Sequence, residues 1–175
     1  MSDPHAASED LIELVDRIVS NHHTFARTEL SRLGSLAHAV AREQGATHAE
    51  LLQLDDLVDQ LATDLYAHME REERVLFPYI VALEASAMGA PHIQPPFGSV
   101  KQPIARMLRD HETARILLQS IRSITRDLSL PAGASDAQRA LYEGIANLER
   151  DLEVHMHLEG DELFVRATAL EGRAA

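Results

Sequence analysis

The stretches DLYAHMEREERVLF at 64–77 and DLEVHMHLEGDELF at 151–164 share the pattern D-L-x-x-H-M-x-x-E-x-x-x-L-F. Seven of the fourteen positions are identical, and the two copies lie 87 residues apart. The apolar residues of each copy recur at a spacing that places them on one face of an α-helix. A repeat of this kind indicates two helices, one in each half of the molecule, related by a pseudo-two-fold axis.

The sequence outside these two stretches also divides into long helical segments. Turn-forming residues are concentrated at 44–48, 86–99 and 128–135, and apolar residues recur every three or four positions between them. Four long helices joined by short connections predict an all-α, up-down-up-down four-helix bundle with an internal two-fold repeat of helix pairs. We expect residues 9–171 to form this bundle and residues 1–8 to be a flexible N-terminus.

The helix boundaries carry local signals as well. Thr47 with Glu50, and Ser135 with Gln138, have the spacing of a capping box at a helix N-terminus. Pro78 falls inside the second helical segment, where it removes a backbone N–H donor. We therefore expect a kink or a break in that helix.

The composition excludes several classes of protein. The net charge is −12, so the surface repels phosphate backbones and a nucleic-acid partner is not expected. The chain has no cysteine, which excludes disulfides and thiolate metal sites. Its apolar runs are shorter than the roughly 20 residues that span a bilayer, and its N-terminus is acidic rather than signal-like. We expect a cytoplasmic protein without a membrane partner.

Four histidines converge when the chain is folded at the three predicted turns. In an antiparallel helix pair, two residues at the same height are equidistant from the turn that joins the helices. The midpoint between His23 and His68 falls at Gly45–Ala46, that between His68 and His111 at Gly89–Ala90, and that between His111 and His155 at Gly133. Each midpoint lies inside a predicted turn. The spacing therefore places four imidazoles at one level of the bundle, on four different helices: His23, His68, His111 and His155.

Two glutamates lie one helical turn from this level. Glu72 follows His68 at i+4, and Glu159 follows His155 at i+4, so each pair shares a helix face. A buried carboxylate needs a proton, a partner or a metal ion. Mixed imidazole and carboxylate ligands suit iron or manganese, and zinc by ligand type alone.

The number of ligands favours two metal ions over one. Six side chains are too many for one tetrahedral zinc ion. Two bridging glutamates and two histidines on each metal, with a bridging oxide or hydroxide, would leave one position open on each ion. The Glu-x-x-His motif of ferritin-like sites is absent from the sequence. Apart from these metal ligands, we assign no catalytic residue.

Other polar residues near the motif have two interpretations. Asp64 and Asp151 either orient the histidine one turn further on or are ordinary solvated acids. Glu73 lies one residue off the ligand face, so we expect a solvated carboxylate. His22 is a weaker candidate than its neighbour, and we interpret His157 as solvated or as a support for a ligand. The remaining histidines are expected on the surface or in loops: His5, His38, His48 and His92.

At these residues the sequence resembles the hemerythrin-like domain proteins. Among them it is most similar to the di-iron family named for the repair of iron centres, which restores iron–sulfur clusters after nitrosative or oxidative damage. The matching stretches are IVSNHHTFARTEL (18–30), LYAHMEREERVLFPYI (65–80), PFGSVKQPIARMLRDHE (96–112) and RALYEGIANLERDLEVHMHLEGDELFVRA (139–167).

The resemblance implies a four-helix bundle with a non-haem di-iron centre of Fe²⁺ or Fe³⁺. By position, it implies that the iron ligands are His23, His68, Glu72, His111, His155 and Glu159. Members of that family commonly carry an N-terminal extension with a cysteine pair, which this sequence lacks. The resemblance therefore supports the di-iron core and leaves any thiol-dependent step without a residue to perform it.

Two functions of different classes follow from the resemblance and the open coordination positions. In the first, the protein supplies iron to damaged iron–sulfur proteins, or reduces NO at the di-iron centre as an enzyme. In the second, it is a hemerythrin-like carrier or sensor of O₂ or NO without turnover. A purely structural bundle with incidental histidines is a third interpretation.

Overall fold

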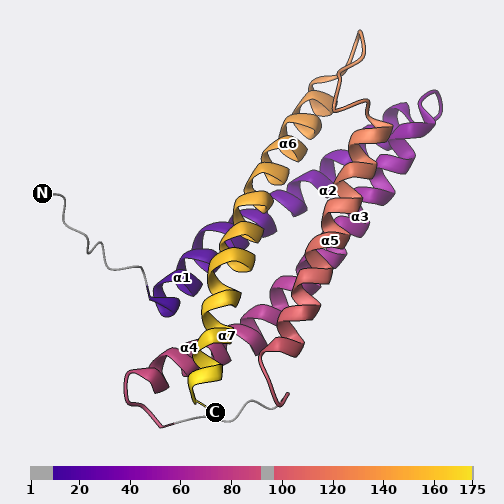
Figure 1. Ribbon diagram of the computed structural model, residues 1–175. Coiled ribbons are helices and arrows are strands. Elements are labelled where there is room, and N and C mark those ends of the chain that lie inside the picture. Colours follow the sequence, from indigo (N-terminus) through magenta and orange to yellow (C-terminus); the bar gives the residue numbers. More distant parts are fainter. Residues whose placement is uncertain (1–9, 92–96, 175) are drawn as a thin grey trace, which may run out of the picture.

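Four long helices make up the part of the chain that the computed structural model describes, residues 10–91 and 97–174 (Figure 1). The first helix comprises α1 (Leu11–Arg17), the π-helical segment η1 (Ile18–His23) and α2 (Thr24–Gln44). The second comprises α3 (Ala49–Arg71), the π-helical segment η2 (Glu72–Leu76) and α4 (Phe77–Ala87), and the third is α5 (Lys101–Ile124). The fourth comprises α6 (Asp136–His157), the π-helical segment η3 (Leu158–Leu163) and α7 (Phe164–Ala174).

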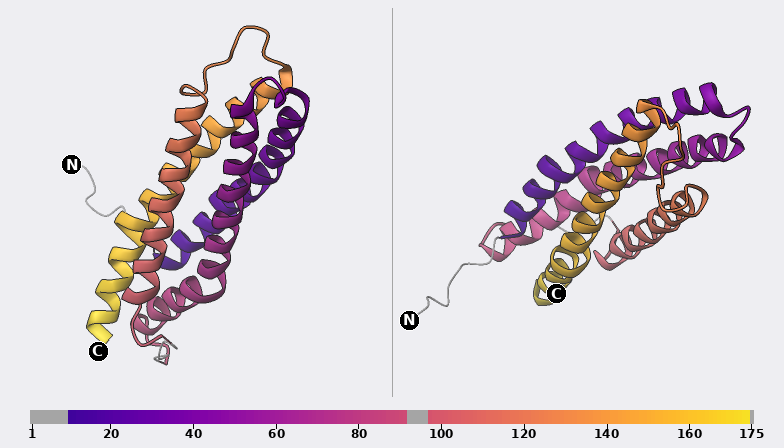
Figure 2. Two further views of the ribbon diagram at one scale, coloured as in Figure 1. Left: turned by 90° about the vertical axis from the view of Figure 1, so that its right-hand side faces the viewer. Right: turned by 90° about the horizontal axis from the view of Figure 1, so that it is seen from above.

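The four helices run alternately up and down and pack side by side. α2 packs against α3 and α6, and α3 also packs against α5, whereas α1, α4 and α7 gather at the opposite end (Figures 1 and 2). The predicted all-α bundle of four helices is confirmed. The boundaries of the expected bundle, 9–171, stay a prediction, and the expected flexible segment, 1–8, lies outside the described residues.

The apolar core consists of two clusters at different heights. The first lies between α2, α3, α5 and α6 and includes Leu33, Leu61 and Leu148. The second lies between α1, α4, α7 and the start of α5 and includes Leu14 and Ile80. The candidate ligand residues lie on the turns between these two clusters, so apolar side chains enclose them from above and below.

Three of the four helices change from α- to π-helical hydrogen bonding in their middle, at η1, η2 and η3. Short π-helical segments are rare and often occur at functional sites. Pro78 lies in the first turn of α4, directly after η2. The second helix bends at this point without breaking, because the π-helical turn accommodates the missing N–H donor (Figure 2).

The predicted caps have different outcomes. The Ser135 hydroxyl accepts the backbone N–H of Gln138, which confirms that helix start. The capping box at Thr47 is wrong: the Thr47 hydroxyl donates to the carbonyl of Gln44 in the preceding turn, and α3 begins after His48 without a side-chain cap. Within the described residues, no helix combines the length and apolar character needed to cross a membrane.

A carboxylate near the C-terminus ties three helices together. Glu171 on α7 accepts hydrogen bonds from the Tyr79 hydroxyl at 3.2 Å, the Ser99 hydroxyl at 2.7 Å and the backbone N–H of Val100 at 2.8 Å. It thereby fixes the end of the fourth helix to α4 and to the start of α5. These bonds close the end of the bundle that is formed by α4 and α7.

Candidate metal centre

The structure brings all six sequence-predicted ligand residues together in the middle of the bundle. They form two groups of four, in which the potential ligand atoms lie within 4.8 Å of one another. Every one of these side chains is buried. The first group is His23, Glu72, His155 and Glu159, and the second is His68, Glu72, His111 and Glu159.

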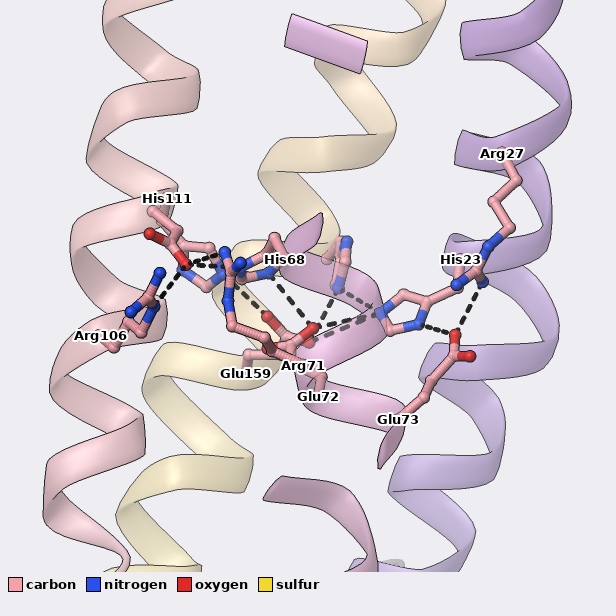
Figure 3. Close-up of polar contacts among 11 residues, drawn as sticks. His23, Arg27, His68, Arg71, Glu72, Glu73, Arg106, His111 and Glu159 are labelled. Carbon is pink, nitrogen blue, oxygen red and sulfur yellow. Dashed lines mark hydrogen bonds and ion pairs between the residues drawn. The ribbon is translucent and has the colours of Figure 1, made fainter. Parts of the chain in front are cut away.

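All four imidazoles direct Nε2 towards the centre of this layer, and Figure 3 shows three of them, His23, His68 and His111. Nε2 of His23 lies 3.2 Å from Nε2 of His155, and Nε2 of His68 lies 3.2 Å from Nε2 of His111. Two neutral imidazoles that face each other through unprotonated nitrogens repel, so each pair requires a proton or another cation between its rings. This arrangement is typical of two histidines that share a cation.

The two glutamates lie between the two histidine pairs and belong to both groups. Oε2 of Glu72 is 3.4 Å from Nε2 of His23 and 3.2 Å from Nε2 of His68. Glu159 uses its two oxygens, with Oε1 2.8 Å from Nε2 of His155 and Oε2 3.0 Å from Nε2 of His111. Each carboxylate therefore reaches both groups, which is the placement that a bridging ligand needs.

The buried carboxylates create a strongly cation-attracting field. Burial opposes charge on the His68 imidazole, but the carboxylates of Glu72 and Glu159 outweigh burial and raise the pKa of His68 to about 9. The pKa of His155 is raised for the same reasons. Burial likewise favours neutral Glu159, yet the surrounding imidazoles hold its pKa well below its usual range. Protons and metal ions therefore compete for the same nitrogens.

Several polar atoms of this layer have no hydrogen-bond partner within the described part of the chain. They include both carboxylate oxygens of Glu72 and Oε2 of Glu159, all of them buried. Buried acceptors without partners cost free energy, so proteins retain them where a ligand completes the site. The orphaned oxygens and the converging Nε2 atoms fit a pair of metal ions that takes imidazole and carboxylate ligands.

The repeated phenylalanine of the two motifs contacts the histidines of the other two helices. Phe77 stacks on His23 with ring centroids 5.7 Å apart, and Phe164 stacks on His111 with centroids 6.4 Å apart. Each repeat thus supplies one histidine, one glutamate and one aromatic ring that covers a histidine of a neighbouring helix. This packing explains why the motif continues to its final Leu-Phe.

Glu73 does not have the solvated carboxylate that its sequence position predicts. Its Oε1 lies 2.7 Å from Nδ1 of His23 and also accepts a 2.7 Å hydrogen bond from Arg27 (Figure 3). Burial favours its neutral form, but these two hydrogen bonds lower the pKa of Glu73. Glu73 follows Glu72 by about 100° around the helix, and that direction points to the neighbouring first helix rather than to water.

The two aspartates of the repeat do not orient the histidine one turn further on. Asp64 accepts a hydrogen bond from Gln60 on its own helix, and Asp151 lies 2.9 Å from Nδ1 of His22. The carboxylate nearest Nδ1 of His68 is instead Asp110, at 3.7 Å. Both aspartates have closer partners, so the possibility that they fix the histidine tautomers is wrong.

The other histidines that the structure describes lie outside the two groups. His22 stacks against His155 with centroids 5.7 Å apart, and His157 pairs with Asp161 at 2.7 Å on the surface. The exposed His38 and His48 pair with Asp55 and Glu50, as expected for surface positions, whereas His5 and His92 lie outside the described residues. Sequence reasoning missed Arg27 and Asp110, which carry no motif signal and become relevant only through their neighbours in space.

These features define a hemerythrin-like bundle, and residues 14–167 match the family described as the hemerythrin HHE cation binding domain. The chain belongs to this family. The match covers all four histidines and both glutamates of the buried layer. The family's description as cation binding agrees with the field that the two buried carboxylates produce.

The chain is also similar to proteins named iron-sulfur cluster repair protein YtfE. It is 35% identical over 155 residues to the protein of Dickeya chrysanthemi, covering 89% of this chain and 65% of that protein. It is 34% identical over 168 residues to the protein of Musicola paradisiaca (94% and 68%) and 32% identical over 171 residues to that of Yersinia pseudotuberculosis (95% and 72%). The chain thus spans about two thirds of the length of these relatives.

Proposed function

We propose that this chain is a non-haem di-iron protein that supplies iron to, or repairs, damaged iron–sulfur clusters under nitrosative or oxidative stress. The proposed ligands of the two irons, with an oxo or hydroxo bridge, are His23, His68, Glu72, His111, His155 and Glu159. The observation that carries the proposal is that two buried groups of four ligands share both glutamates. Similarity to the iron–sulfur cluster repair proteins supports the choice of substrate.

The residues around the site prepare it to hold metal ions. Glu72 and Glu159 provide negative charge among six residues of which none is more than 3% exposed. Hydrogen bonding of Nδ1 of His23 to Glu73 leaves Nε2 available on the side that faces the shared glutamates. Bound iron would supply Lewis-acid and one-electron redox chemistry to a small molecule such as NO or O₂.

The enclosure of the site favours a second candidate, reversible binding of O₂ or NO by a carrier or sensor without turnover. Phe77 and Phe164 cover two of the histidines, and the two apolar clusters exclude bulk water above and below the layer. Such an enclosed site admits small gases more readily than larger molecules. The enclosure by itself does not indicate NO reduction or iron delivery. The measurements described next distinguish gas binding, NO reduction and iron delivery.

The decisive measurement is iron content and Mössbauer spectroscopy on protein that is purified without oxygen. We expect two irons per chain and an antiferromagnetically coupled pair after oxidation. A single zinc ion per chain, with no coupled iron pair after reconstitution, would overturn the di-iron proposal. Addition of NO with detection of N₂O tests reduction, and incubation with an NO-damaged [4Fe–4S] protein tests iron delivery; reversible gas binding with neither outcome supports the carrier.

A pair of histidine variants tests the ligand assignment. His111→Ala removes an imidazole whose Nε2 lies 3.0 Å from Glu159, whereas His157→Ala removes one that is 65% exposed and pairs with Asp161. We expect the first variant to lose at least one iron and the second to keep both. Equal iron content in the two variants, measured by elemental analysis, would contradict the assignment.

A further inference from the structure

The two motif copies differ at the residue that follows each shared glutamate. Glu72 is followed by Glu73, whereas Glu159 is followed by Gly160. The pseudo-two-fold axis relates the two positions, because both lie within the π-helical segments that carry the shared glutamates. A carboxylate is therefore present beside one half of the site and absent beside the other.

In the first half, this carboxylate holds a proposed ligand from behind. Oε1 of Glu73 lies 2.7 Å from Nδ1 of His23, and Arg27 fixes the same oxygen at 2.7 Å from its own Nη1 (Figure 3). His23 is fully buried, and its Nε2 faces Glu72 and His155. A carboxylate on Nδ1 sets the tautomer and the ring orientation of a metal-binding histidine and makes it a stronger ligand.

In the second half, the equivalent histidine has no such support. His111 occupies the position 88 residues after His23, and among the described residues none forms a hydrogen bond with its Nδ1. Arg115 stands 88 residues after Arg27, but it pairs with the exposed Glu153 at 3.4 Å. The side chain that could accept the Nδ1 proton of His111 is missing because the helix has glycine there.

The remaining two histidines do not compensate for this difference. Asp110 is 3.7 Å from Nδ1 of His68, too far for a hydrogen bond, and its nearest oxygen is already bound to Arg71 at 2.7 Å. Nδ1 of His155 is buried and without a partner in the described part of the chain. Of the four proposed histidine ligands, His23 therefore has the firmest support within that part.

We propose that Glu73, fixed by Arg27, is a positioning residue for His23, and that the His23–His155 group consequently binds its metal ion more tightly than the His68–His111 group. The inference rests on the proposed di-metal site and adds an order of loading to it. The first ion enters the group that Glu73 supports, and the ion in the other group is the first to leave.

The test uses the metal-free full chain titrated with Co²⁺ under anaerobic conditions, in the wild type, Glu73→Ala, Glu73→Gln and the control Glu70→Ala. Glu70 is on the same helix, is 56% exposed and pairs with Arg74. Calorimetry gives the two affinities, and proton NMR of the Co²⁺ form records the shifted, solvent-exchangeable Nδ1–H signals of the bound histidines. Circular dichroism of each apo variant measures its fold separately.

We expect two affinities in the wild type, with one protected Nδ1–H signal present from the first equivalent of Co²⁺. Glu73→Ala should weaken the tighter binding by about 10–100-fold and abolish the protection of that signal, while the weaker binding stays unchanged. Glu73→Gln should retain part of the tighter affinity and part of the protection of the Nδ1–H signal, because its amide oxygen still accepts a hydrogen bond. Glu70→Ala should match the wild type.

Two results would overturn the inference. Equal wild-type affinities, or a loss in Glu73→Ala that falls equally on both steps, would mean that Glu73 does not distinguish the two groups. If the wild type takes up fewer than two ions, the proposed di-metal function itself fails. Two ions with an unchanged Glu73→Ala titration would leave that function intact and refute only the role of Glu73.

Discussion

Replacement of Glu72 by glutamine should destabilise the metal-free protein, and the metal-loaded protein still more. Glu72 is fully buried, and its Oε2 lies 3.4 Å from Nε2 of His23 and 3.2 Å from Nε2 of His68. The pKa of His68 is raised to about 9, so its imidazole is protonated at neutral pH in the absence of metal, and Glu72 is one of the carboxylates that balance this charge. The glutamine amide is neutral, so the substitution leaves a buried imidazolium with less compensation.

The expected magnitudes follow from these contacts. A hydrogen bond to a charged partner contributes about 1.5–3 kcal/mol and a neutral one about 0.5–1.5 kcal/mol, so the free energy of unfolding of the apo variant should be lower than that of the wild type by about 1–2 kcal/mol. Free metal at about a hundred times Kd stabilises the wild type by about 2.7 kcal/mol, and the variant should lose most of this increment. The difference in stability between the two proteins should therefore be larger in the loaded form than in the apo form.

The assay is urea unfolding followed by far-ultraviolet circular dichroism, since the chain has no tryptophan for fluorescence. Each protein is measured at neutral pH with a chelator and again with Fe²⁺ without oxygen. Glu70→Gln is the control, because Glu70 is exposed and pairs with Arg74 on the surface, so its replacement should change stability by no more than about 0.5 kcal/mol. An apo Glu72→Gln protein that is at least as stable as the apo wild type would refute the reasoning, because Glu72 would then not compensate the charge of His68 in the metal-free protein.

Two further predictions concern the bundle itself. Gly144→Leu should lower the free energy of unfolding by about 1–3 kcal/mol, because a Cβ there would lie 2.7 Å from Cδ2 of the buried Leu33. Gly172→Ala is the control: the space around its Cβ position is open, so thermal melts should show no change or a slight stabilisation. Burial favours neutral Glu171, but the hydrogen bonds that it accepts outweigh burial and lower its pKa. The stability that Glu171→Gln loses should therefore be fully present at neutral pH, begin to decrease below about pH 4.3 and disappear below the lowered pKa of the folded state. A difference from wild type that is still unchanged at pH 3 would contradict this.

The convergence of the six proposed ligands could be predicted from the sequence because it depends on two simple regularities. Antiparallel helices bring residues equidistant from a turn to one height, and the midpoint between His23 and His68 lies in such a turn. The i, i+4 spacing of His155 and Glu159 then places the carboxylate beside the imidazoles. Both regularities survive small errors in helix boundaries, which is why the wrong cap at Thr47 did not disturb the result.

The side chains that contact the proposed ligands from outside the site could not be predicted from the sequence in the same way. Glu73 was expected in solvent because a single helix has a core side and a solvent side, whereas a helix in a bundle also faces two neighbours. Whether a residue between these directions meets water or a partner depends on the angle between the helices. The contact of Glu73 with His23 therefore requires the positions of two helices, and no one-dimensional pattern contains that information.

The three π-helical segments show how a repeated ligand motif fits into continuous helices. An α-helical turn that widens to π adds a residue without breaking the helix, and each of η1, η2 and η3 contains one proposed ligand: His23, Glu72 or Glu159. α5 carries His111 on an uninterrupted α-helix. The duplication thus preserves the ligands and their π-helical turns in the second and fourth helices, while the first and third helices differ. Differences in metal binding between the two halves should therefore arise from the first and third helices and from the motif positions that differ between the two copies, such as Glu73 and Gly160, rather than from the residues that the copies share.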